Sequence, residues 1–111
     1  MKLVDATSAA LAAVSANSTR PAVSIVHDSE DVRIVVFRIA PGQRVAPHTS
    51  ESTVVLRVLE GSGIISGGND EERHCTRDDM IVYDRGEIHG MSADTEQLLV
   101  MATISPRPAS R

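Results

Sequence analysis

Two histidines, each with a polar residue two positions away, are the residues best suited to chemistry in this sequence. His48 lies two positions before Ser50, and His89 lies two positions after Glu87. Residues two apart in a strand share a face, so the members of each pair can meet one ligand. Neutral imidazoles that converge from two strands suit Fe, Zn, Mn, Ni or Cu. His48 and His89 are therefore the candidate metal ligands, with Ser50 and Glu87 beside them.

Four side chains have a weaker claim to a functional role. Tyr83 ends an apolar run and is expected either at a cavity mouth, where its hydroxyl binds a ligand or donates a proton, or packed in the core. His74 and Cys75 are adjacent and must face opposite ways in a strand, so they cannot form a local nucleophile and base pair. Glu87 follows Asp84-Arg85-Gly86, which is typical of an exposed turn, so a solvated turn residue is the competing interpretation.

The elements that position these residues are predominantly strands. An alanine-rich segment over 5–16 predicts one short helix, with Asp5 or Thr7 as its N-cap and Pro21 beyond its end. Beyond Pro21, β-branched residues alternate with a two-residue period, which predicts strands over 32–37, 53–60, 63–66, 80–83 and 97–104. Short strands separated by turns and not by helices predict an antiparallel barrel or sandwich of about eight strands.

Composition excludes several classes of function. The 111 residues include 15 acidic and 11 basic side chains, and the formal net charge is -4. With no basic stripe and only two aromatic residues, Phe37 and Tyr83, we expect no nucleic-acid partner. Cys75 is the single cysteine and no apolar run approaches the length of a membrane helix. Because polar residues interrupt the N-terminal apolar segment, we expect a cytoplasmic protein without membrane contact.

The segment from Gly42 to Gly61 resembles the first motif of the cupin superfamily. In that motif a glycine is followed by five residues, His-x-His, three or four residues, a glutamate, six residues and a glycine. Gly42, His48 and Gly61 stand at the required spacings. The second histidine of the motif falls on Ser50 and the glutamate falls on Val54, so two of the three metal ligands that the family uses are replaced.

The segment from Asp78 to His89 resembles the second cupin motif, with Gly86 and His89 matching and Asp78 and Asp84 replacing its first glycine and its proline. The resemblance spans roughly 31–104 and implies an all-β, double-stranded β-helix, or jelly-roll barrel. Together with the residue patterns, it predicts a cupin barrel over 21–104, a helical segment over 1–20 and a tail over 105–111. It also implies that His48 and His89 point into the barrel, and that the protein is a homodimer. The prolines of the tail predict a loose end beyond the sheet.

Three interpretations of function remain open, because the cupin fold serves many activities. In the first, a metal held by His48 and His89 assists a reaction, while Glu87 or a histidine moves a proton. In the second, the barrel holds a small organic molecule without chemistry, oriented by the histidines with Ser50, Tyr83 and Glu87 as further ligand-binding residues. In the third, side chains fill the barrel and the role is structural.

Overall fold

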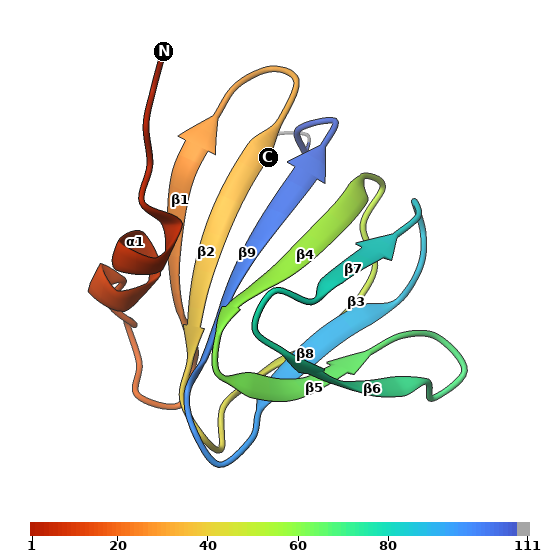
Figure 1. The fold of residues 1–111 in the computed structure, drawn as a ribbon. Coiled ribbons are helices and arrows are strands. Elements are labelled where there is room, and N and C mark those ends of the chain that lie inside the picture. Colours follow the sequence, from red (N-terminus) through yellow and green to blue (C-terminus); the bar gives the residue numbers. More distant parts are fainter. Residues whose placement is uncertain (109–111) are drawn as a thin grey trace.

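The computed structural model describes residues 1–108, which form one short helix and two antiparallel sheets (Figure 1). The elements in chain order are α1 (Ala6–Ala12), β1 (Ala22–Asp28), β2 (Arg33–Ile39), β3 (Arg44–His48), β4 (Thr53–Glu60), β5 (Ser62–Ser66), β6 (Glu72–Thr76), β7 (Met80–Tyr83), β8 (His89–Ala93) and β9 (Leu98–Ser105). The expected all-β barrel with a short N-terminal helix is confirmed, with nine strands in place of about eight.

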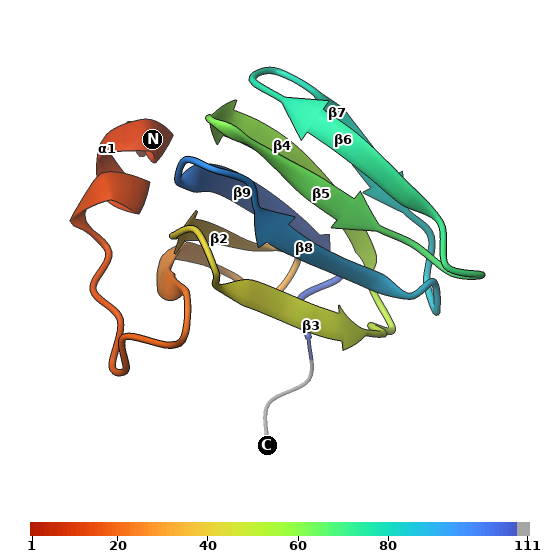
Figure 2. The ribbon, with the colours of Figure 1, turned by 90° about the horizontal axis from the view of Figure 1, so that it is seen from below.

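The two sheets face each other and enclose the core (Figure 2). One sheet has the strand order β1-β2-β9-β4-β7 and the other β3-β8-β5-β6. The largest cluster of buried residues lies between them and is built by alternate positions of β4 and β9, with Ile39, Ile65, Cys75, Tyr83 and Met91 added from other strands. Val54, Leu56 and Val58 of β4 all face inward, as their two-residue spacing predicts.

The helix covers the outer face of the five-stranded sheet (Figure 1). Asp5 caps it by accepting a hydrogen bond from Ser8 N at 3.0 Å, which confirms one of the two expected caps. Ala10 of α1 packs on Val36 and Leu99, which are fully buried on that face. The helix ends at Ala12, four residues earlier than the alanine run predicts. Beyond it, Ser15 and Asn17 make local side-chain hydrogen bonds that compete with helix formation.

The segment over 105–108 differs from the expected loose end, because three contacts hold it against the barrel. Ser105 still belongs to β9. The buried Ser52 donates its hydroxyl to the carbonyl of Pro106 at 2.6 Å, and Arg107 binds both carboxylate oxygens of Asp28. Hydrogen bonds from Arg107 and Arg33 lower the pKa of Asp28 to about 2. Proline rings remove N–H donors, but these contacts use carbonyl and side-chain groups. Residues 109–111 of the expected tail lie outside the described residues.

Candidate functional site

His48 and His89 are direct neighbours in the structure, one on β3 and one on β8. They form a register pair, and their ring centroids lie 4.1 Å apart with an interplanar angle of 63°. The register of this pair shifts between Val45 and His48. In a regular strand, residues three apart point to opposite faces, so the bulge is what allows both Val45 and His48 to line the barrel interior.

The Nδ1 atoms of both rings face backbone carbonyls. Nδ1 of His48 lies 2.9 Å from the oxygen of Ala46, and Nδ1 of His89 lies 3.3 Å from the oxygen of Glu87. A carbonyl only accepts hydrogen bonds, so Nδ1 carries the proton in each neutral ring and Nε2 carries the free lone pair. Within residues 1–108, neither Nε2 has a hydrogen-bond partner. The pair therefore offers two accepting nitrogens.

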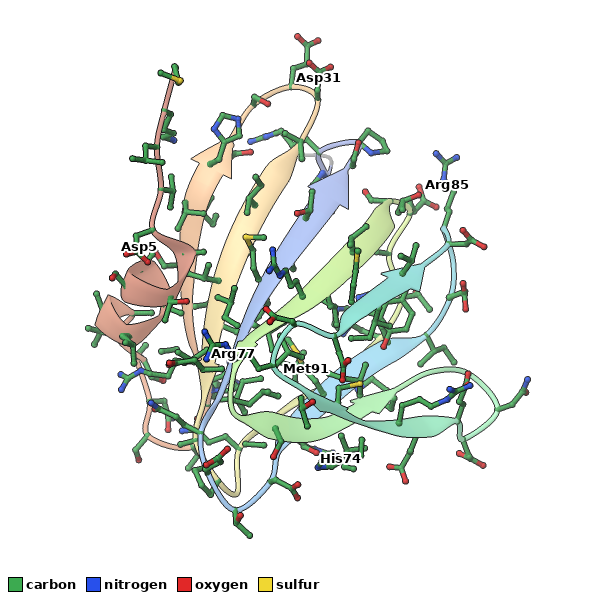
Figure 3. The ribbon with its side chains drawn as sticks, viewed as in Figure 1. Asp5, Asp31, His74, Arg77, Arg85 and Met91 are labelled. Carbon is green, nitrogen blue, oxygen red and sulfur yellow. The ribbon has the colours of Figure 1, made fainter. Side chains whose placement is uncertain are left out.

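The two rings border a cavity of about 230 Å³ inside the barrel, which we call the histidine cavity. Eight of its thirteen lining residues are apolar side chains from both sheets and the C-terminal segment. The lining residues are Phe37, Val45, His48, Thr49, Ser50, Val54, Leu56, His89, Gly90, Met91, Ala102, Ile104 and Pro108. Met91 lies between the two sheets (Figure 3). His48 is exposed and His89 is buried, so polar and apolar surroundings meet across the ring pair.

His89 is 7% exposed and titrates below its ordinary range. Burial lowers the pKa of the imidazole, and repulsion from His48 lowers it further, whereas the hydrogen bond to the Glu87 carbonyl raises it by less. His89 is consequently neutral at pH 7, which keeps its Nε2 lone pair available.

Because the pKa of His89 is lowered in the folded protein, we expect the protein to lose stability as the pH falls. Between the unfolded pKa of about 6.5 and the lower folded pKa, the unfolded chain binds more protons than the folded chain, so stability falls as pH falls. Above pH ~7.5 both states are neutral and the contribution of His89 is constant. Urea unfolding from pH 8 to pH 5 measures the effect.

In that titration the wild type should lose more free energy of unfolding than His89→Gln, by at most about 1.4 kcal/mol per pH unit. His27→Gln is the matched control, because it removes a histidine of β1 that does not line the histidine cavity and leaves the His48–His89 pair intact. Parallel curves for the wild type and His89→Gln would contradict the expectation.

The other predicted ligand-binding residues lie at different distances from this pair. Ser50 lines the histidine cavity, and its Oγ accepts a hydrogen bond from Ser52 N. The ring of Tyr83 lies 5.0 Å from that of His89, but the Tyr83 hydroxyl donates to the carbonyl of Ser66 at 2.7 Å. Burial raises the pKa of Tyr83 to about 12, so its proton is held at neutral pH. Tyr83 thus packs against the His89 ring from the core side.

Glu87 turns away from the histidine pair. Its Oε1 accepts a hydrogen bond from Asp84 N at 2.8 Å within the turn between β7 and β8, and its side chain borders a different cavity beside β6 and β7. This is the geometry of a turn residue. Only the backbone carbonyl of Glu87 reaches His89.

The residues of the histidine cavity do not fit a resident metal ion with a full set of protein ligands. A zinc site ordinarily takes three or four, and the cavity supplies two imidazoles. Val54 stands at the position of the family's carboxylate ligand, is 4% exposed and packs in the apolar core. No group of three or more His, Cys, Asp or Glu side chains suited to a metal occurs within residues 1–108.

Phe37 and Pro108 are among the wall residues that were not predicted from the sequence. Phe37 carries a usable signal, because it alternates with Val36 in an expected strand and therefore faces the opposite side of the sheet. Pro108 carries none, since its position depends on the contacts of Ser52 and Arg107 far along the chain.

The strand order, the paired histidines and the cavity between the two sheets together define a cupin. The family model described as the cupin domain matches residues 35–105, and the chain belongs to this family. A search of curated proteins found no match. Within the described residues, no helix has the length and apolar character needed to cross a membrane.

Solved structures of similar fold cover nearly the whole chain. An RmlC-like cupin protein from Desulfovibrio desulfuricans is 31% identical, with a TM-score of 0.80 over 96% of this chain and 97% of that chain. An uncharacterized conserved protein with a double-stranded β-helix domain from Klebsiella pneumoniae is 21% identical, with a TM-score of 0.85 over 99% and 94%. KdgF from Halomonas sp. is 23% identical, with a TM-score of 0.77 over 86% and 87%. The last two likenesses concern the fold alone.

Proposed function

We propose that this cupin binds a small, mostly apolar organic molecule in the histidine cavity, oriented by hydrogen bonds to His48 and His89. The observation that carries the proposal is the pair of adjacent imidazoles whose Nδ1 atoms face backbone carbonyls, at the border of an apolar cavity. Apolar walls with a few convergent polar groups are typical of small-molecule sites.

The size of the cavity restricts the ligand. Pockets for drug-sized ligands span roughly 300–1,000 Å³, whereas an apolar cavity of about 150 Å³ in another protein accepts benzene. The histidine cavity, at about 230 Å³, lies between these values. A single substituted ring or a short branched chain matches this volume.

The polar end of the ligand must donate a hydrogen bond. Both Nε2 atoms accept in the tautomers described above, and His89 is neutral at pH 7 because burial lowers its pKa. A hydroxyl donates to one of these nitrogens and an amino group can donate to both, while a carboxylate brings only further acceptors. Phe37, Leu56 and Ile104 would then contact the apolar body.

Binding needs no metal in this proposal. The alternative, a divalent ion held by His48 and His89, would take its remaining ligands from water or from the organic molecule, because Ser50 and Val54 replace the side chains that the cupin motif uses. Metal content of the purified protein, measured by elemental analysis before and after chelation, separates the two forms of the proposal.

We expect 4-methylphenol, whose single O–H donates to one Nε2, to bind the chelated protein. Its affinity should fall about fivefold in whichever of His48→Ala and His89→Ala removes that acceptor. A net hydrogen bond contributes about 1 kcal/mol and tenfold corresponds to about 1.4 kcal/mol. Toluene has the same ring and methyl group without the hydroxyl, so its affinity should not fall in either variant. Isothermal titration calorimetry, with competition for the weaker ligand, measures each constant.

His74→Ala is the matched control, because His74 is exposed on the outer side of β6 (Figure 3) and pairs with Asp94. It should bind 4-methylphenol as the wild type does. Equal losses for 4-methylphenol and toluene in the His48 and His89 variants would show that only shape had changed, and would refute the hydrogen-bonding role. Binding that disappears on chelation would support the metal-dependent form.

The homodimer and the cytoplasmic location stay predictions. One feature favours association through a sheet edge, since β1 is an edge strand and carries the exposed apolar residues Val23 and Ile25. These two pair with Phe37 and Val35 of β2 and so share the inner face of the sheet. A second copy placed against this edge would remove them from water.

A further inference from the structure

Another cavity, of about 250 Å³, lies beside the C-terminal end of β2. Its walls come from the loop after α1, the start of β1, the end of β2 and the loop before β9. The lining residues are Ser15, Ser18, Arg20, Ala22, Arg38, Ala40, Gln43 and Gln97. We call it the arginine cavity. It shares no residue with the histidine cavity.

The charge of the arginine cavity is opposite to that of the chain. The protein has a formal net charge of -4, yet this lining includes two arginines and no acidic residue. Among the ion pairs within residues 1–108, none involves Arg20 or Arg38. Two guanidinium groups at one cavity therefore lack a counter-charge from the described chain.

Arg38 supplies an independent sign of an unfilled interaction. Its Nη2 donates to the carbonyl of Ala13 at 2.8 Å, which fixes the guanidinium. Its Nε is buried and has no hydrogen-bond partner, unlike every other buried side-chain nitrogen or oxygen atom of the described residues. Buried donors are ordinarily satisfied, and a partly buried guanidinium is ordinarily paired with an anion.

The loop that carries Arg20 is held in place by its own hydrogen bonds. Ser15 Oγ donates to the carbonyl oxygen of Arg20 at 2.7 Å and accepts a hydrogen bond from Asn17 N. Gln43 accepts from Ala40 N at 2.9 Å through Oε1 and donates to the carbonyl of Ser18 at 2.7 Å through Nε2. The loop is thus fastened to the turn after β2, and binding an anion between Arg20 and Arg38 does not first have to order it.

We propose that the arginine cavity binds a doubly charged tetrahedral oxyanion of the phosphate type. Two guanidinium groups balance a phosphate, which carries about -1.5 to -2 at neutral pH, better than a singly charged carboxylate. Guanidinium also matches phosphate oxygens through paired N–H donors. Glu60 and Glu96 line a neighbouring cavity that shares Gln97 with this one, so the ligand is uncharged in any part that extends toward them.

The shared chemistry is a phosphate group, either as free inorganic phosphate or as a small phosphate ester. Calorimetric titrations at constant ionic strength with inorganic phosphate, glycerol phosphate, sulfate and acetate compare the sources. Phosphate and sulfate should bind saturably and at least tenfold more tightly than acetate. Tighter binding of glycerol phosphate than of inorganic phosphate assigns the site to an ester, and equal or weaker binding assigns it to the free ion.

Three charge-neutralising variants test the location. Arg20→Gln should weaken phosphate binding at least tenfold, and because the Arg20 side chain is exposed, the fold does not depend on it. Arg38→Gln should weaken binding similarly. Arg85→Gln is the matched control, since Arg85 projects from the loop after β7, on the side of the molecule away from α1 (Figure 3), and the change in net charge is the same.

Equal losses in Arg20→Gln and Arg85→Gln would overturn the proposal, because they would show a general charge effect. Absence of saturable phosphate binding to the wild type up to tens of millimolar would overturn it as well. If Arg38→Gln does not fold, Arg20→Gln decides the outcome. Neither arginine touches the histidine cavity, so this test and that of 4-methylphenol binding succeed or fail separately.

Discussion

Replacing Ser50 by His and Val54 by Glu together should complete a four-ligand divalent-metal site at the histidine cavity. Both positions line the histidine cavity with His48 and His89, so the double variant would present three imidazoles and one carboxylate to a common space. Zinc sites use this number and these types of ligand. We expect Zn²⁺ or Ni²⁺ to be retained stoichiometrically through dialysis by the double variant, and at least 100-fold more weakly by the wild type.

The metal should also decide the stability of the double variant. Without it, Val54→Glu buries a carboxylate at a position that is 4% exposed, which costs several kcal/mol or forces the group to stay protonated. Bound metal pairs that charge, so the melting temperature should rise steeply when Zn²⁺ is added.

Elemental analysis and thermal melts with and without Zn²⁺ measure both effects. Arg57→Glu with Ser50→His is the matched control, since Arg57 points to the outer face of the same strand and forms an ion pair with Asp78 there. A folded double variant that retains no more zinc than this control would contradict the assignment of Val54 to the carboxylate position.

Gly61→Ala should lower the free energy of unfolding by roughly 2–5 kcal/mol. Gly61 joins β4 to β5 with φ +79°, a left-handed conformation that costs a residue with a Cβ roughly 1–2 kcal/mol. A Cβ there would also lie 2.0 Å from the carbonyl oxygen of Gln97, a backbone atom that cannot move without disturbing the start of β9. Overpacking of this kind typically adds 1–3 kcal/mol.

Two other glycines separate the conformational part of this loss from the steric part. Gly42 has φ +86° and open space around its Cβ position, so Gly42→Ala should cost only about 1–2 kcal/mol. Gly68 has neither restriction, and Gly68→Ala should change stability by no more than ~0.5 kcal/mol. Urea denaturation of the three variants gives the comparison. Equal losses at Gly61 and Gly42 would contradict the steric contribution of Gln97.

Most of the fold could be predicted because its signals are local. The alternation Val54, Leu56, Val58 predicts both the strand and its inner face, and all three residues are buried there. The Asp5 cap is equally local, since a carboxylate three residues before Ser8 N suffices. The helix end was not predicted, because alanine propensity continues to Ala16 while the hydrogen bonds of Ser15 and Asn17 favour a turn.

The candidate site was less accessible from sequence because its geometry depends on contacts between distant segments. The motif spacing indicates that His48 and His89 approach one another. The bulge after Val45, which turns His48 inward, breaks the two-residue alternation of the strand, so the hydrophobic pattern of the sequence does not indicate it. Glu87 satisfies the same spacing rule as Ser50, yet a hydrogen bond to Asp84 N holds it in the turn. The arginine cavity joins Arg20 to Arg38 across a loop, and no short motif spans that distance.

The wall contact of Pro108 has a practical consequence for measurements on this protein. Arg107 holds the segment that reaches Pro108 through its ion pair with Asp28, and Asp28 does not line the histidine cavity. A contact outside the cavity therefore helps to position one of its walls. Measurements of ligand affinity consequently report on this contact as well as on the cavity itself.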